Sequence, residues 1–311
     1  MTARRRWSRV VGPLVVVLIL LLVWEFVVSN DDNLQALNRT VERLTGWNPG
    51  LEGLPATILP RPSLILRQLL VVPRNGKGGP DYFWRHTRAT LFAALLGFAL
   101  GNLSAILTAT AFLYVKPLER ALMPLALALR SVPLVAITPL LLRIRFTIAD
   151  LPAVQSSPLL NAIFGTDFAI KMLIVVIICY FPTLVNAARG LASVEQPALE
   201  LMYTLRAGRW QTYWKLRVPT ALPIIFAALR VTSSSAVLAA VVAEWLSASQ
   251  GLGYIIKRSF ADKSVSRMWM AMVISSAIAI AAFGAVTWLQ RWIIPWYRSV
   301  VHLRSAVEGQ G

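Results

Sequence analysis

The sequence predicts an all-α, polytopic membrane protein with about six transmembrane helices. Of its 311 residues 57% are hydrophobic and only 14% are charged, and the mean hydropathy is +0.62. Soluble domains carry about 25% charged residues. The alternating ten-residue pattern of a transmembrane β-barrel is absent. Six mostly apolar stretches approach or exceed the roughly 20 residues that a bilayer-spanning helix needs. They cover residues 11–28, 89–113, 121–142, 168–188, 218–246 and 268–290.

The net charge of +17 does not indicate a nucleic-acid partner, because the basic residues are spread between apolar runs and form no soluble basic domain. The apolar runs predict that the chain is surrounded by membrane lipid. The single cysteine, Cys179, lies in an apolar run, so an intrachain disulfide is excluded and we expect a small buried side chain.

The first apolar stretch follows a basic start and has two interpretations. A cleaved signal peptide needs small residues after the apolar core, and Trp24 to Val28 do not supply them. We therefore favour a retained anchor, with residues 1–28 forming a cytoplasmic tail and the first transmembrane helix. With six spans the C-terminal tail, residues 298–311, would be cytoplasmic too, although the lysine and arginine counts of the two sides are nearly equal.

Residues 29–86 predict an external loop. Within it, Leu59-Pro60-Arg61-Pro62-Ser63 precedes an apolar run, so Ser63 can cap a short amphipathic helix on the outer membrane surface. A solvated loop with one helical turn is the alternative.

Two glycines, Gly97 and Gly101, are four residues apart in the second span. This spacing lets two helix backbones approach closely, because neither position has a Cβ. We expect the partner helix to belong to the same chain.

Three residues within apolar stretches are candidates for a solute pathway or gate. Arg130 and Pro133 stand together, and a proline in a membrane helix frees a carbonyl that must face protein or water. The alternative for Arg130 is contact with lipid headgroups. Glu244 is costly at membrane depth unless it is paired, protonated or wet. It faces the protein interior in one interpretation and water at the outer end of its helix in the other.

A polar segment, residues 194–219, separates the fourth and fifth apolar stretches and predicts two short helices joined by a tight turn. Pro197 suits the first helical turn, where its missing N–H costs nothing. Ala207-Gly208 suits the turn, because glycine permits unusual backbone angles. We expect Leu199, Met202 and Leu205 to share one face of the first helix and Pro219 to mark the start of the next span.

At this segment the sequence resembles the permease subunits of binding-protein-dependent ABC importers, the ABC transmembrane type-1 domain. That family has a cytoplasmic loop with E-A-A, then G after three residues, and I-x-L-P after nine more. Glu200 takes the acidic position, and Arg206 stands where the family has its glycine, two residues before Gly208. The resemblance assigns an ATPase-coupling loop to 194–219. Its key residues would be Glu200, Leu201, Met202, Arg206, Gly208, Leu216 and Pro219.

Further motifs resemble the nitrate, sulfonate and taurine branch of that family and place the type-1 domain at residues 87–297. They are the runs Leu59–Ser63, Arg130–Ala136, Ala240–Glu244 and Gly251–Ile256. The branch pattern does not include the stretch from about 143 to 163, which we interpret as an outer-face loop or a re-entrant piece.

The resemblance implies a permease homodimer in the cell inner or plasma membrane, served by two ATPase subunits and an extracytoplasmic solute-binding protein. The chain has no G-x-x-x-x-G-K-[ST] phosphate loop, so ATP and Mg are expected on the partner ATPase and no cofactor on this chain. No catalytic or metal-binding residue is predicted, and His86 and His302 are expected at the surface. The implied solute is a small anion, a sulfonate or a vitamin precursor.

Two other functions remain as alternatives. A secondary transporter or channel would work without an ATPase, and an inverted internal repeat, which we do not find, would support it. An intramembrane enzyme would need paired catalytic groups at one membrane depth, for which Arg230 and Glu244 have no motif.

Overall fold

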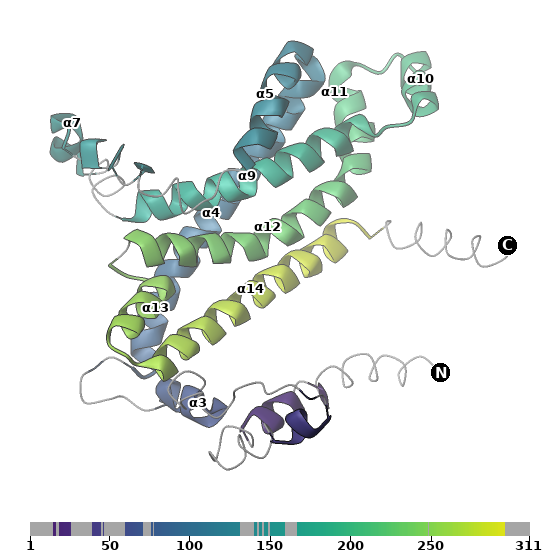
Figure 1. Cartoon of the computed structure of the whole chain (residues 1–311). Helices are drawn as coiled ribbons and strands as arrows, with labels where there is room; N and C mark the ends of the chain where they lie inside the picture. Colours follow the sequence, from purple (N-terminus) through teal and green to yellow (C-terminus); the bar gives the residue numbers. More distant parts are fainter. Residues whose placement is uncertain are drawn as a thin grey trace. The chain divides into compact units, whose positions relative to one another are not determined.

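The structure is a computed structural model of the full chain, and every regular element among its described residues is a helix (Figure 1). This confirms the all-α prediction. The described residues are 15–16, 19–25, 39–44, 46, 60–70, 76, 78–130, 140–141, 143–144, 146–148, 150–158, 167–247 and 249–295. The elements are α3 (Pro62–Leu70), α4 (Pro80–Tyr114), α5 (Lys116–Arg130), α7 (Pro152–Ser156), α9 (Phe168–Ala192), α10 (Gln196–Thr204), α11 (Arg209–Thr212), η2 (Tyr213–Arg217), α12 (Val218–Ser247), α13 (Leu252–Ala261) and α14 (Val265–Ile293).

Among the described residues, four helices are long and apolar enough to cross a membrane. They are α4, α9, the continuous helix Arg209–Leu246 and α14. They coincide with four of the six predicted spans, which supports a multi-pass membrane protein. The other two predicted spans, 11–28 and 121–142, lie partly outside the described residues, so the count of six remains a prediction.

The chain divides into two compact units. The smaller unit comprises residues 1–85 and 255–273, and the larger comprises 86–254 and 274–311.

In the smaller unit, the short helix expected in the external loop is present as α3. It begins at Pro62, so Ser63 lies inside its first turn and the prediction that Ser63 caps it was wrong. Glu25 takes that role instead. Its carboxylate accepts hydrogen bonds from the Ser63 backbone N–H (3.0 Å) and the Ser63 hydroxyl (2.7 Å). A carboxylate at a helix N-terminus satisfies free N–H groups and complements the helix dipole.

The core of the larger unit lies where α4, α9 and α12 pack together, and small residues permit this packing. A Cβ at Gly97 would lie 2.5 Å from the Cβ of Val175, and one at Gly101 would lie 2.7 Å from the carbonyl oxygen of Val176. Both neighbours belong to α9. The glycine pair therefore packs within the chain, as predicted. Cys179 is fully buried at this contact and belongs to the same core.

A buried polar cluster links the same three helices. Asn102 of α4 is 4% exposed, and its Oδ1 accepts hydrogen bonds from the hydroxyls of Thr183 (2.5 Å) and Thr232 (3.2 Å). Its Nδ2 donates to the Phe98 carbonyl at 2.6 Å. Interhelical hydrogen bonds of this kind fix the register of helices that lipid alone would not hold together.

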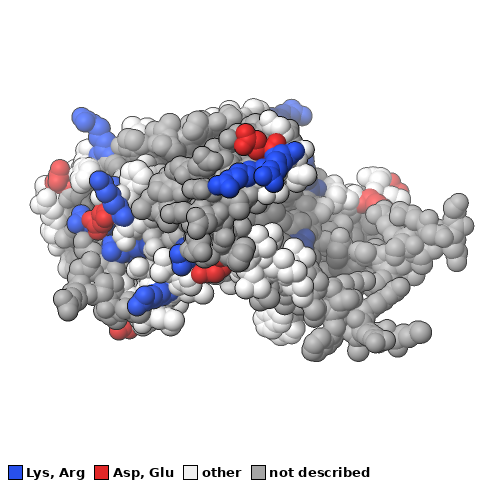
Figure 2. Space-filling model, turned by 60° about the horizontal axis from the view of Figure 1, so that its bottom comes forward, with Lys and Arg blue, Asp and Glu red and all other residues white. Residues whose placement is uncertain are grey.

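The described lysine and arginine residues do not gather into one basic surface on the face in Figure 2. Lysine and arginine side chains there are interspersed with acidic ones and with uncharged surface. This distribution agrees with the sequence argument against a nucleic-acid partner.

Candidate functional site

The segment 194–219 forms a helical hairpin made of α10, α11 and η2 (Figure 1). α10 follows an extended Glu195, and Pro197 lies in its first turn as the sequence predicted. No residue of α10 is fully buried, and Leu201, Tyr203 and Leu205 are 59%, 86% and 67% exposed. Of the three residues expected on one face, Leu199 and Met202 are half-buried, whereas Leu205, the C-cap of α10, is exposed.

Arg206 provides the left-handed residue that ends α10. Its φ is 50°, its N–H donates to the Tyr203 carbonyl (2.9 Å), and the Ala207 N–H donates to the Met202 carbonyl (3.0 Å). These two bonds form a Schellman motif, whose left-handed position usually holds glycine. The turn was predicted at Ala207-Gly208, and that was wrong. Gly208 has an ordinary φ of −68°, and a Cβ there would meet nothing within 4 Å.

The second arm of the hairpin does not end before the next span. α11, η2 and α12 form one helix, Arg209–Leu246, of 38 residues. α12 begins at Val218, so Pro219 lies at the start of the next span as expected, but the helix is not interrupted there. In the π-helical turn Tyr213–Arg217, the Val218 N–H bonds to the Tyr213 carbonyl. This wider turn directly precedes Pro219, which lacks an N–H and would crowd a regular α-helical turn.

Two side chains show how the hairpin is held. Tyr213 is 8% exposed, and its hydroxyl lies 2.8 Å from the Thr110 hydroxyl of α4. Glu200 is exposed and accepts a hydrogen bond from the Gln196 side chain at 3.1 Å. Glu200 thus braces α10 along its length, and the described contacts do not connect it with the turn.

Glu244 is the centre of a second constellation, and its side chain is fully buried. Its Oε2 accepts hydrogen bonds from the Thr90 hydroxyl of α4 (2.8 Å) and the Gly253 backbone N–H (3.0 Å). The Thr90 oxygen also accepts a hydrogen bond from the Leu252 N–H at 2.9 Å. The structure therefore supports the interior position of Glu244 over a wetted helix end.

Two glycines let the chain wrap around this carboxylate. Gly251 has a φ of 120°, and a Cβ there would overlap the Glu244 carboxylate. A Cβ at Gly253 would lie 2.8 Å from the Glu244 Cβ. The Gly251 N–H donates to Nδ1 of His86 at 3.0 Å, and His86 is 2% exposed. The prediction that His86 lies at the surface was wrong. We call Glu244, Thr90, His86 and residues 251–253 the Glu244 node.

A buried cation lies beside the Glu244 node. Lys171 of α9 is 5% exposed, interacts electrostatically with Glu244, and donates a hydrogen bond to the Gln250 carbonyl at 2.9 Å. The other two pathway candidates are not brought together with Glu244 by the described residues. Arg130 ends α5, but its side chain lies outside the described residues, as do Pro133 and His302.

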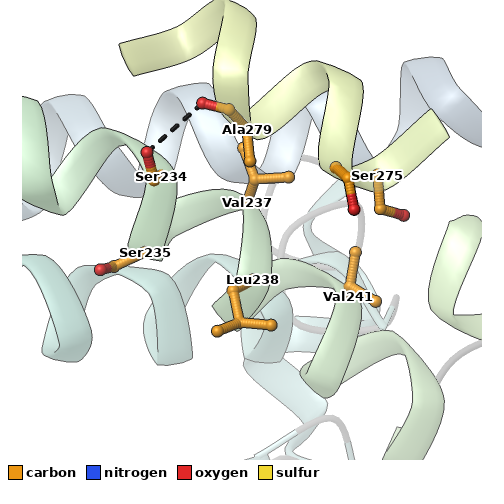
Figure 3. A pocket seen from close by; sticks show the side chains of 8 residues that line it. Ser234, Ser235, Val237, Leu238, Val241, Ser275 and Ala279 are labelled. Carbon is orange, nitrogen blue, oxygen red and sulfur yellow. Dashed lines mark hydrogen bonds between the residues drawn. The ribbon is translucent and has the colours of Figure 1, made fainter. Parts of the chain in front are cut away.

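A pocket of about 330 Å³ lies between α12 and α14 (Figure 3). Its lining residues are aliphatic or carry hydroxyls, and none is charged. They are Ser234, Ser235, Val237, Leu238, Val241, Ser275, Ser276 and Ala279. Figure 3 shows Ser275 and Val241 facing each other across it, and the Ser234 hydroxyl donates to the Ala279 carbonyl at 3.3 Å. We call it the serine pocket.

Sequence reasoning missed the partners of Glu244 and the Asn102 cluster. A buried carboxylate requires donors, and glycines spaced as 251 and 253 shortly after it are the signal that points to backbone donors. For Thr90 and Asn102 the sequence offers no signal, because their partners lie on other helices.

Comparisons with known proteins agree with this architecture. Residues 97–299 match the family described as "Binding-protein-dependent transport system inner membrane component". The chain is 27% identical over 281 residues to a probable ABC transporter permease protein of Haemophilus influenzae, covering 90% of this chain and 96% of that protein.

Two further relatives have named solutes. The chain is 28% identical over 243 residues to a formylaminopyrimidine transport permease protein of Halalkalibacterium halodurans, covering 78% of this chain and 90% of the relative. It is 28% identical over 258 residues to a riboflavin transport system permease protein of Chloroflexus aurantiacus, covering 82% of this chain and 87% of that relative.

Transport in this family depends on a binding protein, and an ABC importer includes an ATPase subunit. The match covers more than half of the chain and includes the helical hairpin, the serine pocket, Glu244 and residues 251–253, whereas His86 and Thr90 of the Glu244 node precede it. The chain belongs to the family of binding-protein-dependent transport system inner membrane components and is the permease subunit of an ABC importer, a transport component and not an enzyme.

Proposed function

We propose that α10 docks on the partner ATPase and that the continuous helix Arg209–Leu246 carries the resulting movement to the solute pathway. The observation that supports this most directly is the exposure of Leu201, Tyr203 and Leu205 on one short helix. Docking a short helix with exposed apolar side chains in a groove of a partner is a common mode of recognition. Glu200 and Met202 lie on this helix, Arg206 forms the turn that ends it, Gly208 precedes α11 as its N-cap, and Leu216 and Pro219 lie in the continuous helix.

The complete importer would contain two copies of this chain, two ATPase subunits and an extracytoplasmic binding protein. ATP and Mg would bind the ATPase only. The helical hairpin and both termini would lie on the cytoplasmic side of the cell inner or plasma membrane. The first span would end near residue 28, the external loop would run to 86, and the type-1 domain would cover 87–297. Arg130, Pro133 and Glu244 would act at the pathway or its gate.

The serine pocket is our candidate for a part of the solute pathway, and its chemistry favours an uncharged, hydrogen-bonding solute. Its described lining residues include four serines and no cationic side chain, whereas a sulfonate or another small anion is bound most strongly by charged donors. The permeases for formylaminopyrimidine and riboflavin among the relatives have solutes of the favoured kind. A vitamin precursor is therefore preferred over a sulfonate.

The docking proposal is tested by co-expressing the permease with its ATPase and binding protein. Glu200→Lys reverses a charge on α10, and Tyr203→Asp removes its most exposed apolar side chain. Both variants should reach the membrane at the normal level, but ATPase co-purification and solute uptake should fall. Glu42→Lys makes the same charge change at an exposed residue of the short helical stretch 39–44, within the proposed external loop, and serves as the matched control. If association and uptake survive both α10 changes, the docking assignment is wrong.

The solute proposal is tested separately. Calorimetric titration of the partner binding protein should show binding of an uncharged pyrimidine or flavin, and no binding of taurine. The reverse preference would overturn the proposed solute class and leave the docking assignment untouched.

A further inference from the structure

A second pocket, of about 340 Å³, lies where the C-terminal end of α4 meets the helical hairpin. We call it the basic pocket. Its lining residues come from both elements, and all belong to the larger unit. They are Leu113, Tyr114, Ala207, Arg209, Thr212 and Arg217.

The walls of the basic pocket are held by hydrogen bonds. The hydroxyls of Thr110 and Tyr213 lie 2.8 Å apart and join α4 to η2. Arg217 donates from Nη1 to the Leu191 carbonyl at 2.9 Å, which holds its guanidinium in place and leaves other N–H groups for a ligand. The Thr212 hydroxyl donates to the Gly208 carbonyl at 3.2 Å. The pocket therefore exists before any ligand arrives.

The charge of the basic pocket is positive and unbalanced. The described residues that line it supply two guanidinium groups and no carboxylate. Neither Arg209 nor Arg217 forms an ion pair with a described acidic side chain. An arginine presents a planar fork of N–H donors that matches the oxygens of a phosphate group, so two arginines at one pocket favour a phosphate ligand.

The surroundings of the basic pocket correspond to a membrane–water interface. Leu113 and Tyr114 end the apolar helix α4, and Val218 begins the apolar part of the continuous helix. Trp210 and Trp214, beside the pocket in sequence, are 71% and 52% exposed. Exposed tryptophan and tyrosine side chains concentrate at the headgroup level of membranes, and basic pockets between transmembrane helices on the cytoplasmic side bind anionic headgroups.

We propose that the basic pocket binds the phosphate of an anionic phospholipid, with Arg209 and Arg217 as its ligands. The lipid would lie in the cytoplasmic leaflet, and only this assignment of the leaflet rests on the proposed function. An acidic group of the ATPase is the less favoured occupant, because the exposed apolar surface suited to a protein partner is on α10 and does not line the pocket.

The test is native mass spectrometry of the purified full-length permease, titrated with phosphatidylglycerol and with phosphatidylcholine of the same acyl chains. Arg209→Gln should weaken phosphatidylglycerol binding about fivefold, as expected for one basic residue at a membrane surface, and leave phosphatidylcholine binding unchanged. Lys215→Gln is the matched control, because Lys215 is exposed in the neighbouring turn and does not line the pocket. Since Arg217 also bonds to Leu191, Arg217→Gln is paired with Arg217→Lys, which keeps the charge and should retain most of the lipid affinity.

Two further measurements identify the occupant. Inorganic phosphate is titrated alone, and its binding should not depend on Arg209 as phosphatidylglycerol binding does. If Arg209→Gln weakens the binding of phosphate but not that of phosphatidylglycerol, the ligand is a free anion and the lipid proposal is overturned. ATPase co-purification should be lowered by Glu200→Lys and unaffected by Arg209→Gln. If Arg209→Gln lowers ATPase association and leaves lipid binding unchanged, the pocket binds the ATPase and the lipid proposal is wrong. Because lipid and ATPase binding are read out separately, the two proposals fail independently.

Discussion

Replacement of Gly251 by alanine tests whether the glycine turn holds the Glu244 carboxylate in place. Gly251 has a φ of 120°, where an L-residue is strained by about 1 kcal/mol or more. The new Cβ would overlap the carboxylate, so Glu244 would have to move and lose its hydrogen bonds from Thr90 and Gly253. At about 1 kcal/mol for each bond, the total destabilisation is about 3 kcal/mol. With an unfolding entropy of about 2.1 cal/mol/K per residue, this corresponds for a chain of 311 residues to a Tm lower by roughly 5 °C.

The assay is heat treatment of the detergent-solubilised permease followed by fluorescence-detected size-exclusion chromatography. Gly284→Ala is the matched control, because Gly284 lies inside α14 and a Cβ there meets nothing within 4 Å. Its Tm should be unchanged or slightly raised, since alanine is the better helix former. Glu244→Ala removes the group that the new methyl group strikes, so the double variant should be less destabilised than the sum of the two single variants. A Gly251→Ala protein whose Tm falls by less than about 2 °C, or additive effects in the double variant, would refute the reasoning.

Three further changes have expected outcomes. Arg206→Gly should relieve the left-handed strain at the end of α10 by about 1 kcal/mol; hydrogen–deuterium exchange of the Ala207 amide should slow about fivefold, and unchanged exchange would argue against the Schellman motif. Gly101→Val should separate α4 from α9 and lower the Tm by several degrees, because its Cβ would lie 2.7 Å from the carbonyl oxygen of Val176; a fully stable variant would contradict the close packing. Thr183→Val should cost about 1 kcal/mol by removing a donor to Asn102; an unaltered melting curve would mean that this hydrogen bond contributes nothing.

The sequence predicted the helical class and four of the spans because bilayer thickness sets a simple requirement for length and hydrophobicity. It also predicted the helical hairpin, because Pro197 and the polar run between two apolar ones are local signals. The hairpin's details were beyond such signals. Glycine is the residue that most often adopts the left-handed conformation, so the turn was predicted at Gly208. In the structure Arg206 adopts this conformation, and the backbone hydrogen bonds donated by Arg206 and Ala207 hold it in place.

The Glu244 node shows a second limit of sequence reasoning. The free-energy cost of burying a carboxylate predicted that Glu244 needs hydrogen-bond partners. It did not identify Thr90 as one of them, because Thr90 lies 154 residues away in the chain. His86 was expected at the surface because it flanks a span, but it is buried, and its ring accepts a hydrogen bond from the Gly251 backbone N–H. Partners of this kind depend on which helices become neighbours, and hydrophobic periodicity does not specify that.

The uninterrupted path of α11, η2 and α12 has a mechanical consequence. At 1.5 Å per residue, the 38-residue helix Arg209–Leu246 is about 57 Å long. Arg209 and Glu244 lie near its opposite ends, and no non-helical residue separates them. A rod of this kind yields most readily to bending where its hydrogen bonds are irregular, which here is at the π-helical turn before Pro219 and at Pro223. Under the proposed docking, an axial displacement of the hairpin also displaces the end of the helix that carries Glu244.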